Sequence, residues 1–184
     1  MTVRQSAPPG TSIARQTVQQ HHSLSSPESS LHDIHFRLIR PDDWHRLQLF
    51  HQRLSASSVR LRFHGAKREL SEPLAHYFTE LDGRNNVAVA ATTGTRGRIV
   101  GVARFFRIGP NSAEVAFVVE DAYQGHGIGR RLMQHLIVEA HKNSIIEFVA
   151  EVLPENTRML QLLEDTGPVH FSYQQGVDEV RLSI

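Results

Sequence analysis

The chain has 184 residues, enough for one domain that buries a core of its own. It contains no cysteine, which excludes a disulfide framework, a thiolate nucleophile and a thiolate metal site. Lysine and arginine number 20 against 19 acidic residues, and a formal net charge of +1 does not favour binding to nucleic acid or to an anionic membrane. No apolar run approaches the roughly 20 residues of a membrane span, and the N-terminus has no apolar signal-peptide core. We therefore expect a soluble, cytoplasmic protein.

Residues 1–32 are rich in Ser, Gln, His, Pro and Thr and contain only scattered apolar residues. Such a composition cannot offset the entropy of ordering. The sequence therefore predicts a disordered or loosely packed tail, followed by one domain over residues 33–184. His21 and His22 are adjacent in this tail, but no acidic or cysteine partner stands at ligand spacing, so we predict no metal site.

Hydrophobic periodicity places the first elements of the domain. Alternating apolar residues predict a strand at 34–38. A helix from Asp42 or Asp43 to about Leu54 and a second from about Ser71 to Leu81 follow it. Strands at 87–92 and 99–108 are joined by a glycine turn, and a third at 112–120 completes an antiparallel meander.

The second half of the domain begins with an amphipathic helix that ends near Lys142. A largely apolar strand at 146–153 follows, and a strand, helix, strand sequence predicts that its two strands are parallel. A short helix from Asn156 and two strands, at about 169–174 and 177–184, complete the chain. The expected fold class is α/β (α+β), with a mixed seven-stranded sheet and about four helices.

The turn QGHGIG has glycine at positions 125, 127 and 129, directly before the amphipathic helix. Free backbone amides at a helix N-terminus are suited to bind phosphate. A dinucleotide fingerprint requires glycine or alanine at the position of Arg130, and a P-loop requires Lys and then Ser or Thr after Gly129, so neither motif matches. Glycines that serve packing alone are an alternative, although packing explains one glycine better than three.

This turn, after an apolar strand, resembles motif A of the GNAT superfamily of N-acetyltransferases, through Gln124, Gly125, Gly127, Ile128, Gly129 and Arg130. The order of elements over residues 34–184 is similar to the GNAT fold. Further segments resemble the GNAT domain of Pat-type protein lysine acetyltransferases: RPDD (40–43), LSASSVRLRF (54–63), GVARF (101–105), AEVAF (113–117) and VLPENTRML (152–160). The resemblance implies an acetyl-CoA-dependent N-acetyltransferase whose two central parallel strands splay apart to hold the pantetheine arm.

The resemblance also implies a set of cofactor-binding residues, because the glycine turn would hold the pyrophosphate and the central strand the pantetheine arm. These residues are Val118, Val119, Glu120, Gln124, Gly125, His126, Gly127, Ile128, Gly129, Arg130 and Asn156. An arginine on an exposed helix turn can equally be a solvated charge. Asn156 can equally be a plain helix N-cap, and one residue can serve both purposes.

Glu114 is the predicted catalytic base, because an alkylammonium with a pKa of about 10.4 must lose a proton before its nitrogen attacks a thioester. Strand alternation places Glu114 on one face with Ala116 and Val118, and the small Ala116 leaves space beside the carboxylate. The alternative is an exposed strand carboxylate without a catalytic role. Glu120 shares this face but lies about 20 Å away, at about 3.3 Å per residue.

Two positions depart from the family pattern. Leu163 stands where many GNAT enzymes have a tyrosine acid, so we assign no general acid, and TGPV at 166–169 replaces the usual Gly-Phe. The expected partner is an amine acceptor, either a small molecule or a protein lysine, and the alternative function is a non-catalytic acyl-CoA-binding sensor. Basic residues at 60, 62, 67 and 68 are a weaker sign of an acidic partner surface, and the sequence leaves the oligomeric state open, a homodimer included.

Overall fold

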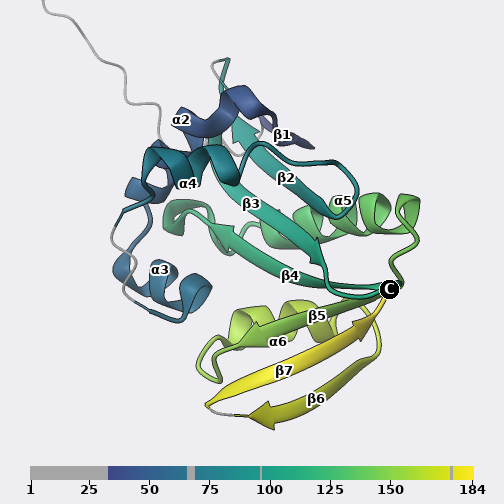
Figure 1. The fold of residues 1–184 in the computed structure, drawn as a ribbon. Helices are drawn as coiled ribbons and strands as arrows, with labels where there is room; N and C mark the ends of the chain where they lie inside the picture. Colours follow the sequence, from purple (N-terminus) through teal and green to yellow (C-terminus); the bar gives the residue numbers. More distant parts are fainter. Residues whose placement is uncertain (1–32, 66–68, 96, 175) are drawn as a thin grey trace, which may run out of the picture.

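The computed structural model describes residues 33–65, 69–95, 97–174 and 176–184. These residues form a sheet of seven strands in the order β1-β2-β3-β4-β5-β7-β6 (Figure 1). The strands are β1 (Ile34–Leu38), β2 (Asn86–Thr93), β3 (Arg98–Arg107), β4 (Ser112–Val119), β5 (Glu147–Val152), β6 (Val169–Gln174) and β7 (Val177–Ser183). The predicted tail, with its adjacent histidines, lies outside the described residues.

Strand pairing follows most of the sequence-based prediction. β2, β3 and β4 form the expected antiparallel meander, β4 and β5 are parallel, and β6 and β7 form the final hairpin. The hairpin joins the sheet through β7, which lies between β5 and β6. The predicted mixed seven-stranded sheet is therefore confirmed. The sequence did not predict that β7 would be the strand that pairs with β5.

The described residues contain five α-helices and two 3-10 turns. They are η1 (Pro41–Asp43), α2 (Trp44–Gln52), α3 (Ala56–Phe63), α4 (Glu72–Tyr77), η2 (Asp121–Tyr123), α5 (Ile128–Lys142) and α6 (Thr157–Glu164). α3 was not predicted from the sequence, because Val59, Leu61 and Phe63 alternate with Arg60 and Arg62 as the residues of a strand do. Its one clear signal is Ser55, whose hydroxyl accepts a hydrogen bond from the Ser58 N–H at 3.1 Å. None of these helices has the length and apolar character required to cross a membrane.

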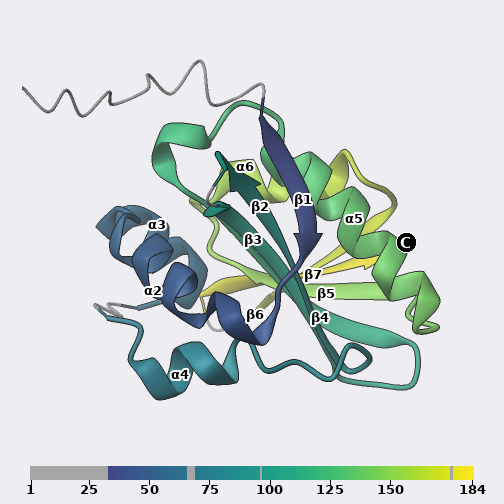
Figure 2. The same cartoon turned by 90° about the horizontal axis from the view of Figure 1, so that it is seen from above.

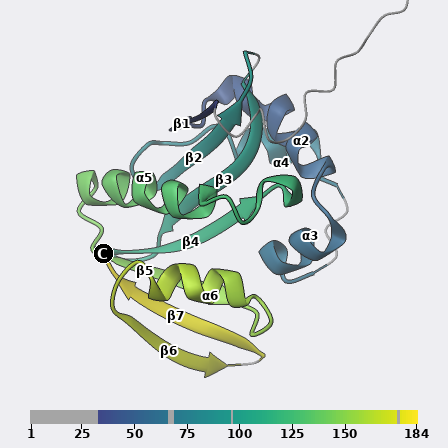
Figure 3. The same ribbon diagram turned by 180° about the vertical axis from the view of Figure 1, so that it is seen from behind.

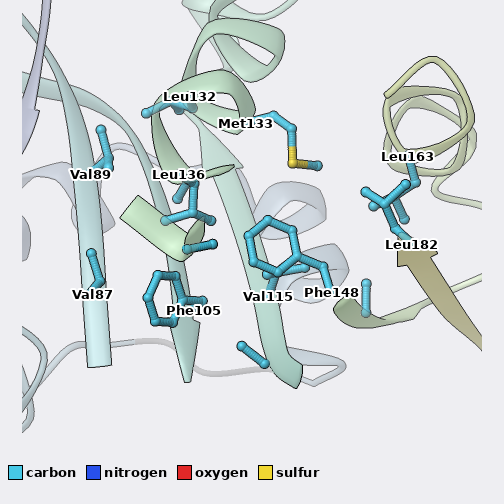
Figure 4. Close-up of a cluster of buried hydrophobic side chains, with 14 of the residues drawn as sticks. Val87, Val89, Phe105, Val115, Leu132, Met133, Leu136, Phe148, Leu163 and Leu182 are labelled. Carbon is cyan, nitrogen blue, oxygen red and sulfur yellow. The ribbon is translucent and has the colours of Figure 1, made fainter. Parts of the chain in front are cut away.

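Helices cover both faces of the sheet (Figure 2). α5 packs across β2, β3 and β4 on one face, and α2 and α4 pack on the opposite face. The larger core lies under α5 and includes the side chains labelled in Figure 4: Val87, Val89, Phe105, Val115, Leu132, Met133, Leu136, Phe148, Leu163 and Leu182. Because a fully buried side chain of this size contributes about 1.5 to 3 kcal/mol, this core holds α5 firmly against the meander.

The two central parallel strands separate along their length. β4 pairs with β5 only from Ser112, opposite Glu147, to Glu114, opposite Val149. β3 stays paired with β4 as far as Val119, and β7 stays paired with β5 along its whole length. Figure 1 shows β4 and β5 diverging after this short paired region, and Figure 3 shows α6 on the same side of the sheet as α5. The predicted splay of the central strands is confirmed, and it begins at Glu114.

Candidate active site

A cleft of about 880 Å³ is formed by α3, the end of β4, the glycine turn and α6. Its volume is in the range of small-molecule and cofactor sites. Most of the residues predicted to bind the cofactor line it, namely Val118, Val119, Gln124, Gly125, Gly127, Ile128, Gly129, Arg130 and Asn156. Segments that are distant in sequence therefore meet around one cavity beside the open part of the central sheet.

The glycine turn has a left-handed backbone at two positions. Gly125 and Gly127 have φ angles of +79° and +75°, and a Cβ atom at either position would meet nothing within 4 Å. Glycine is therefore required here by backbone conformation and not by lack of space. The Arg131 N–H donates to the Gly127 carbonyl at 3.1 Å, the first hydrogen bond of α5. The three preceding helix amides have no partner inside the helix, and the positive end of the helix dipole faces the cleft.

Gln124 connects three elements of the cleft wall. Its Nε2 donates to the Ser58 hydroxyl at 3.1 Å and to the Val119 carbonyl at 3.0 Å. Its Oε1 accepts a hydrogen bond from Arg158 at 2.5 Å. Gln124 thus joins α3, the end of β4 and α6, so the walls of the cleft are held in place before any ligand binds.

Asp121 fixes the N-terminus of α3 against the same wall. Its carboxylate accepts hydrogen bonds from the N–H and hydroxyl of Ser55, at 3.0 and 2.7 Å, and from the hydroxyl of Ser58 at 2.9 Å. Burial acts to raise the pKa of Asp121, but these hydrogen bonds outweigh it and hold the pKa below the usual range. Asp121 is therefore a carboxylate at neutral pH, and it anchors a helix that the sequence alone did not reveal.

The charged and polar groups near the phosphate-binding turn have partners already. Arg130 donates to Asp165 at 2.6 Å, with 63% and 37% of the two side chains exposed, and such a pair is worth at most about 1 kcal/mol. A phosphate can therefore displace Asp165 at little cost. Arg131 stacks instead over the ring of Phe36 at 4.3 Å. Asn156 accepts a hydrogen bond from the N–H of Met159 at 3.3 Å as the N-cap of α6, and it also lines the cleft.

Glu114 occupies the last position at which β4 pairs with β5. It is exposed and lies opposite Phe106 of β3, on the face that also carries Ala116 and Val118. Among the described residues its carboxylate has no hydrogen-bond partner, and its charge acts on the neighbouring guanidinium of Arg62. Glu114 does not line the cleft itself, but it stands where the separation of the two strands begins.

Two residues predicted to bind the cofactor are placed elsewhere. The N–H of Glu120 donates to the Val100 carbonyl, and its carbonyl accepts from the Tyr123 N–H, both at 2.8 Å. The residue as a whole is 6% exposed, and its side chain forms ion pairs with Arg53 and Arg98. Because both main-chain groups form hydrogen bonds within the fold, Glu120 is less suited than Val118 and Val119 to bind a pantetheine arm. His126 is exposed within the glycine turn and does not line the cleft.

The cleft also contains residues that sequence reasoning missed. From α3 they are Ser57, Ser58, Leu61 and Arg62, and from the α6 region Glu155, Thr157, Arg158, Met159, Gln161, Leu162 and Asp165. The N-cap signal at Ser55 could have revealed α3. Arg60, predicted to be part of a basic surface, forms an ion pair with Glu155, and positions 67 and 68 lie outside the described residues. No group of three potential metal ligands occurs in the described part of the chain.

A comparison with known families identifies the family of this chain. Residues 47–167 match the acetyltransferase (GNAT) family. The chain belongs to the GNAT family. This confirms the resemblance found in the sequence, and GNAT acetyltransferases use acetyl-CoA as the acetyl donor. The donor is bulky and carries a pyrophosphate, which fits a cleft of about 880 Å³ with unpaired helix amides at one end.

Individual relatives agree with this family assignment. The chain is 34% identical over 146 residues to acetyltransferase Pat of Mycolicibacterium smegmatis, a match that covers 78% of this chain and 44% of that protein. It is 29% identical over 154 residues to an acetyltransferase of Pseudomonas aeruginosa, and 82% of each protein is covered. This GNAT chain therefore spans less than half the length of the first relative.

Solved structures show the same fold. The GNAT domain of S. lividans Pat matches with a TM-score of 0.76 and 34% identity, over 81% of this chain and 89% of that chain. A structure from Salmonella typhimurium that contains its cofactor acetyl-CoA matches with a TM-score of 0.65 and 16% identity, over 83% of this chain and 93% of that chain. The second likeness is one of fold alone, whereas the first also extends to the sequence.

Proposed function

We propose that this chain transfers the acetyl group of acetyl-CoA to a primary amine, with Glu114 as the catalytic base. The observation that carries the proposal is the position of Glu114 at the residue pair where β4 and β5 separate. The cleft follows from this separation and ends at the unpaired amides of α5. A single ligand with a pyrophosphate at one end and a reactive thioester at the other suits both features.

The cleft suggests how the donor is held. The first turn of α5 and the glycine turn bind the pyrophosphate through backbone amides, supported by Arg130 once it leaves Asp165. The unpaired edge of β4, up to Val119, offers backbone groups to the pantetheine arm. This arrangement brings the thioester toward the start of the splay and thus toward Glu114.

The chemistry requires a neutral amine and a departing thiol. Glu114 takes a proton from the acceptor ammonium, and the freed nitrogen lone pair attacks the carbonyl carbon of the thioester. A C–N bond forms, the C–S bond breaks, and the sulfur leaves as a thiolate that takes a proton from water. An exposed carboxylate at the strand junction can pass its proton to solvent between turnovers.

A protein lysine is the second acceptor to consider, because the relative from M. smegmatis is named acetyltransferase Pat and the sequence resembles Pat-type lysine acetyltransferases.

One observation favours the alternative function, a non-catalytic acyl-CoA-binding sensor. Leu163, at the position of the usual tyrosine acid, is fully buried in the core and can offer no proton. A thiol with a pKa near 8.5 can leave without an acid, so we retain the catalytic proposal.

The proposal is tested by measuring thiol release from acetyl-CoA with small amines and lysine peptides, for the wild type and for Glu114→Gln. Because general base catalysis contributes about 100-fold to 10,000-fold, we expect Glu114→Gln to lower kcat by about that factor while the Kd for CoA stays unchanged. Glu139→Gln, at a partly buried position of α5 outside the cleft, is the matched control. Full activity of Glu114→Gln would disprove the base assignment, and CoA binding without release for any amine would support the sensor instead.

A further inference from the structure

A second, smaller cavity lies on the face of the sheet that carries Glu114. It has a volume of about 30 Å³ and lies between β3, β4 and the helices of that face. Its walls are apolar, from residues such as Leu47, Phe50, Leu70 and Phe78, apart from His51 and two arginines. A space of this size holds about two water-sized groups, which is also the room that the two oxygens of a carboxylate require.

Arg104 of β3 is the most unusual residue of this cavity. It is 5% exposed, and its ring neighbours are Phe78 at 4.3 Å and Phe106 at 5.7 Å. One terminal nitrogen donates to the Phe78 carbonyl at 3.3 Å, and the other, Nη1, has no hydrogen-bond partner among the described residues. Burial, together with the nearby charge of Arg62, lowers the pKa of Arg104 to about 9. Burying a guanidinium without an anion is energetically costly, and no carboxylate of the described residues forms an ion pair with Arg104.

Arg62 of α3 adds a second positive charge at the same place. It lines both the small cavity and the large cleft. Burial lowers its pKa to about 10, and the opposing influence comes from the carboxylate of Glu114. Arg62 therefore lies within electrostatic reach of Arg104 on one side and of the proposed base on the other.

The strand register fixes how far this cavity is from the reaction centre. Arg104 lies opposite Ala116, and Phe106 lies opposite Glu114. Arg104 and Glu114 are thus diagonal neighbours on one face of the sheet, with Cα atoms about 7 to 8 Å apart. Ala116, between them on β4, lines the small cavity, and Val118 lines both cavities. A molecule of a few bonds can therefore reach Glu114 and Arg104 at once.

We propose that Arg104 and Arg62 bind a carboxylate of the acceptor, so that the preferred substrate is a small amine that also carries a carboxylate. A guanidinium donates two parallel hydrogen bonds to a carboxylate, and an anion here would supply the missing partner of Nη1. The amine of such an acceptor lies at Glu114 while its carboxylate fills the small cavity. This inference rests on the proposed acetyl transfer, because it names the acceptor of that reaction.

The same chemistry could instead come from the donor, as a carboxylate at the end of a longer acyl group. Rates are therefore measured with matched pairs: β-alanine against β-alaninamide, and 4-aminobutyrate against 4-aminobutanamide, each with acetyl-CoA. A second arm uses succinyl-CoA with the two neutral amides. We expect acetyl-CoA and the carboxylated amines to give kcat/KM values about 100-fold above those of the amides. Preference for succinyl-CoA with neutral amines would assign the carboxylate to the donor and overturn the acceptor proposal.

Variants test the two arginines directly. Arg104→Met and, on the more accessible helix, Arg62→Met should each lower kcat/KM for 4-aminobutyrate by about 30-fold or more, and change that for its amide less than about threefold. Arg84→Met, an exposed arginine outside both cavities, is the control and should leave both values unchanged. Equal losses for the acid and the amide would show a merely structural role and overturn the proposal, as would a preference for amides or lysine peptides.

A binding measurement separates this inference from the proposed function. N-acetyl-4-aminobutyrate, the expected product, should raise the Tm of the CoA-bound wild type but not that of CoA-bound Arg104→Met. This result is expected even if no amine gives thiol release, in which case the acetyl transfer fails while the carboxylate site stands. No Tm increase for the wild type, with CoA binding intact, would overturn the carboxylate site.

Discussion

Glu120, which the sequence analysis placed in the cofactor site, has a buried carboxylate with two arginine partners. Its two oxygens accept hydrogen bonds from Arg53 of α2, at 3.0 Å, and from Arg98 at the start of β3. Arg53 also donates to the Ile99 carbonyl at 2.7 Å. Glu120 therefore ties α2 and β3 to the end of β4, and its role is to hold the strand that carries the cleft. We expect Glu120→Gln to weaken the fold and leave cofactor binding intact.

The magnitude follows from the burial of the three groups. The Glu120 side chain is 8% exposed, whereas those of Arg53 and Arg98 are 30% and 45% exposed. Breaking a fully buried ion pair costs about 3 to 5 kcal/mol, and solvent around the arginines reduces the cost here to about 2 kcal/mol. For a domain of about 150 residues this corresponds to a Tm lowered by about 4 to 8 °C.

Thermal unfolding and CoA titration at 20 °C measure the two effects separately. Glu139→Gln, which removes a partly exposed pair with Lys142, is the matched control and should change the Tm by less than about 2 °C. The Kd for CoA should be the same for all three proteins. An unchanged Tm combined with weaker CoA binding in Glu120→Gln would refute the reasoning and restore Glu120 to the cofactor site.

Two further predictions concern acid stability and the glycine turn. Asp43 is 1% exposed and accepts hydrogen bonds from Arg37 at 2.6 and 2.8 Å; burial acts to raise its pKa, but these bonds outweigh it and lower the pKa. The stability that the ionised Asp43 contributes is therefore present above the unfolded pKa of about 3.9 and is lost as the pH falls through the folded pKa. Asp43→Asn should lower the free energy of unfolding in urea by about 2 kcal/mol at pH 7, and by progressively less in more acidic solution. An equal loss at pH 7 and pH 2 would contradict this. Gly127→Ala should lower the free energy of unfolding by about 1 to 2 kcal/mol and weaken CoA binding, because the φ angle of Gly127 is +75°. Gly129 is helical, and a Cβ atom there would lie 3.7 Å from the Leu162 side chain, so Gly129→Ala should be neutral or up to about 1 kcal/mol stabilising. Equal losses of stability in the two variants would argue against a backbone cause.

Local patterns in the sequence predicted most of the fold, because each pattern reports on its own segment. Alternation and turn residues located the seven strands, and the strand, helix, strand order indicated the parallel central pair. α3 was missed because its packing against β4 depends on residues far along the chain, among them Asp121, which holds its N-terminus. The position of β7 between β5 and β6 is likewise a tertiary choice, since a hairpin can join a sheet through either strand.

The candidate site divides in the same way. The glycine turn, the proposed phosphate-binding part, could be predicted because its conformation is set within one short segment, where Gly125 and Gly127 have positive φ angles. The carboxylate site could not, because Arg104 reads as an ordinary polar residue of a strand. The proposed role of Arg104 depends on Phe78, Arg62 and the small cavity, which come together only in the folded chain. Glu120 shows the converse, since the resemblance implied a cofactor-binding role for its main chain, whereas both of its main-chain groups form hydrogen bonds within the fold.

Leu163 sets a chemical limit on the donor. Its side chain is fully buried in the core, lies beside Leu182 in Figure 4 and does not line the cleft. A leucine at this position cannot protonate a leaving group. A thiolate needs no such help, because the thiol pKa is about 8.5, whereas a strongly basic alkoxide would. The arrangement of Glu114 and Leu163 therefore supports base-assisted attack on a thioester and disfavours transfer from an oxygen ester.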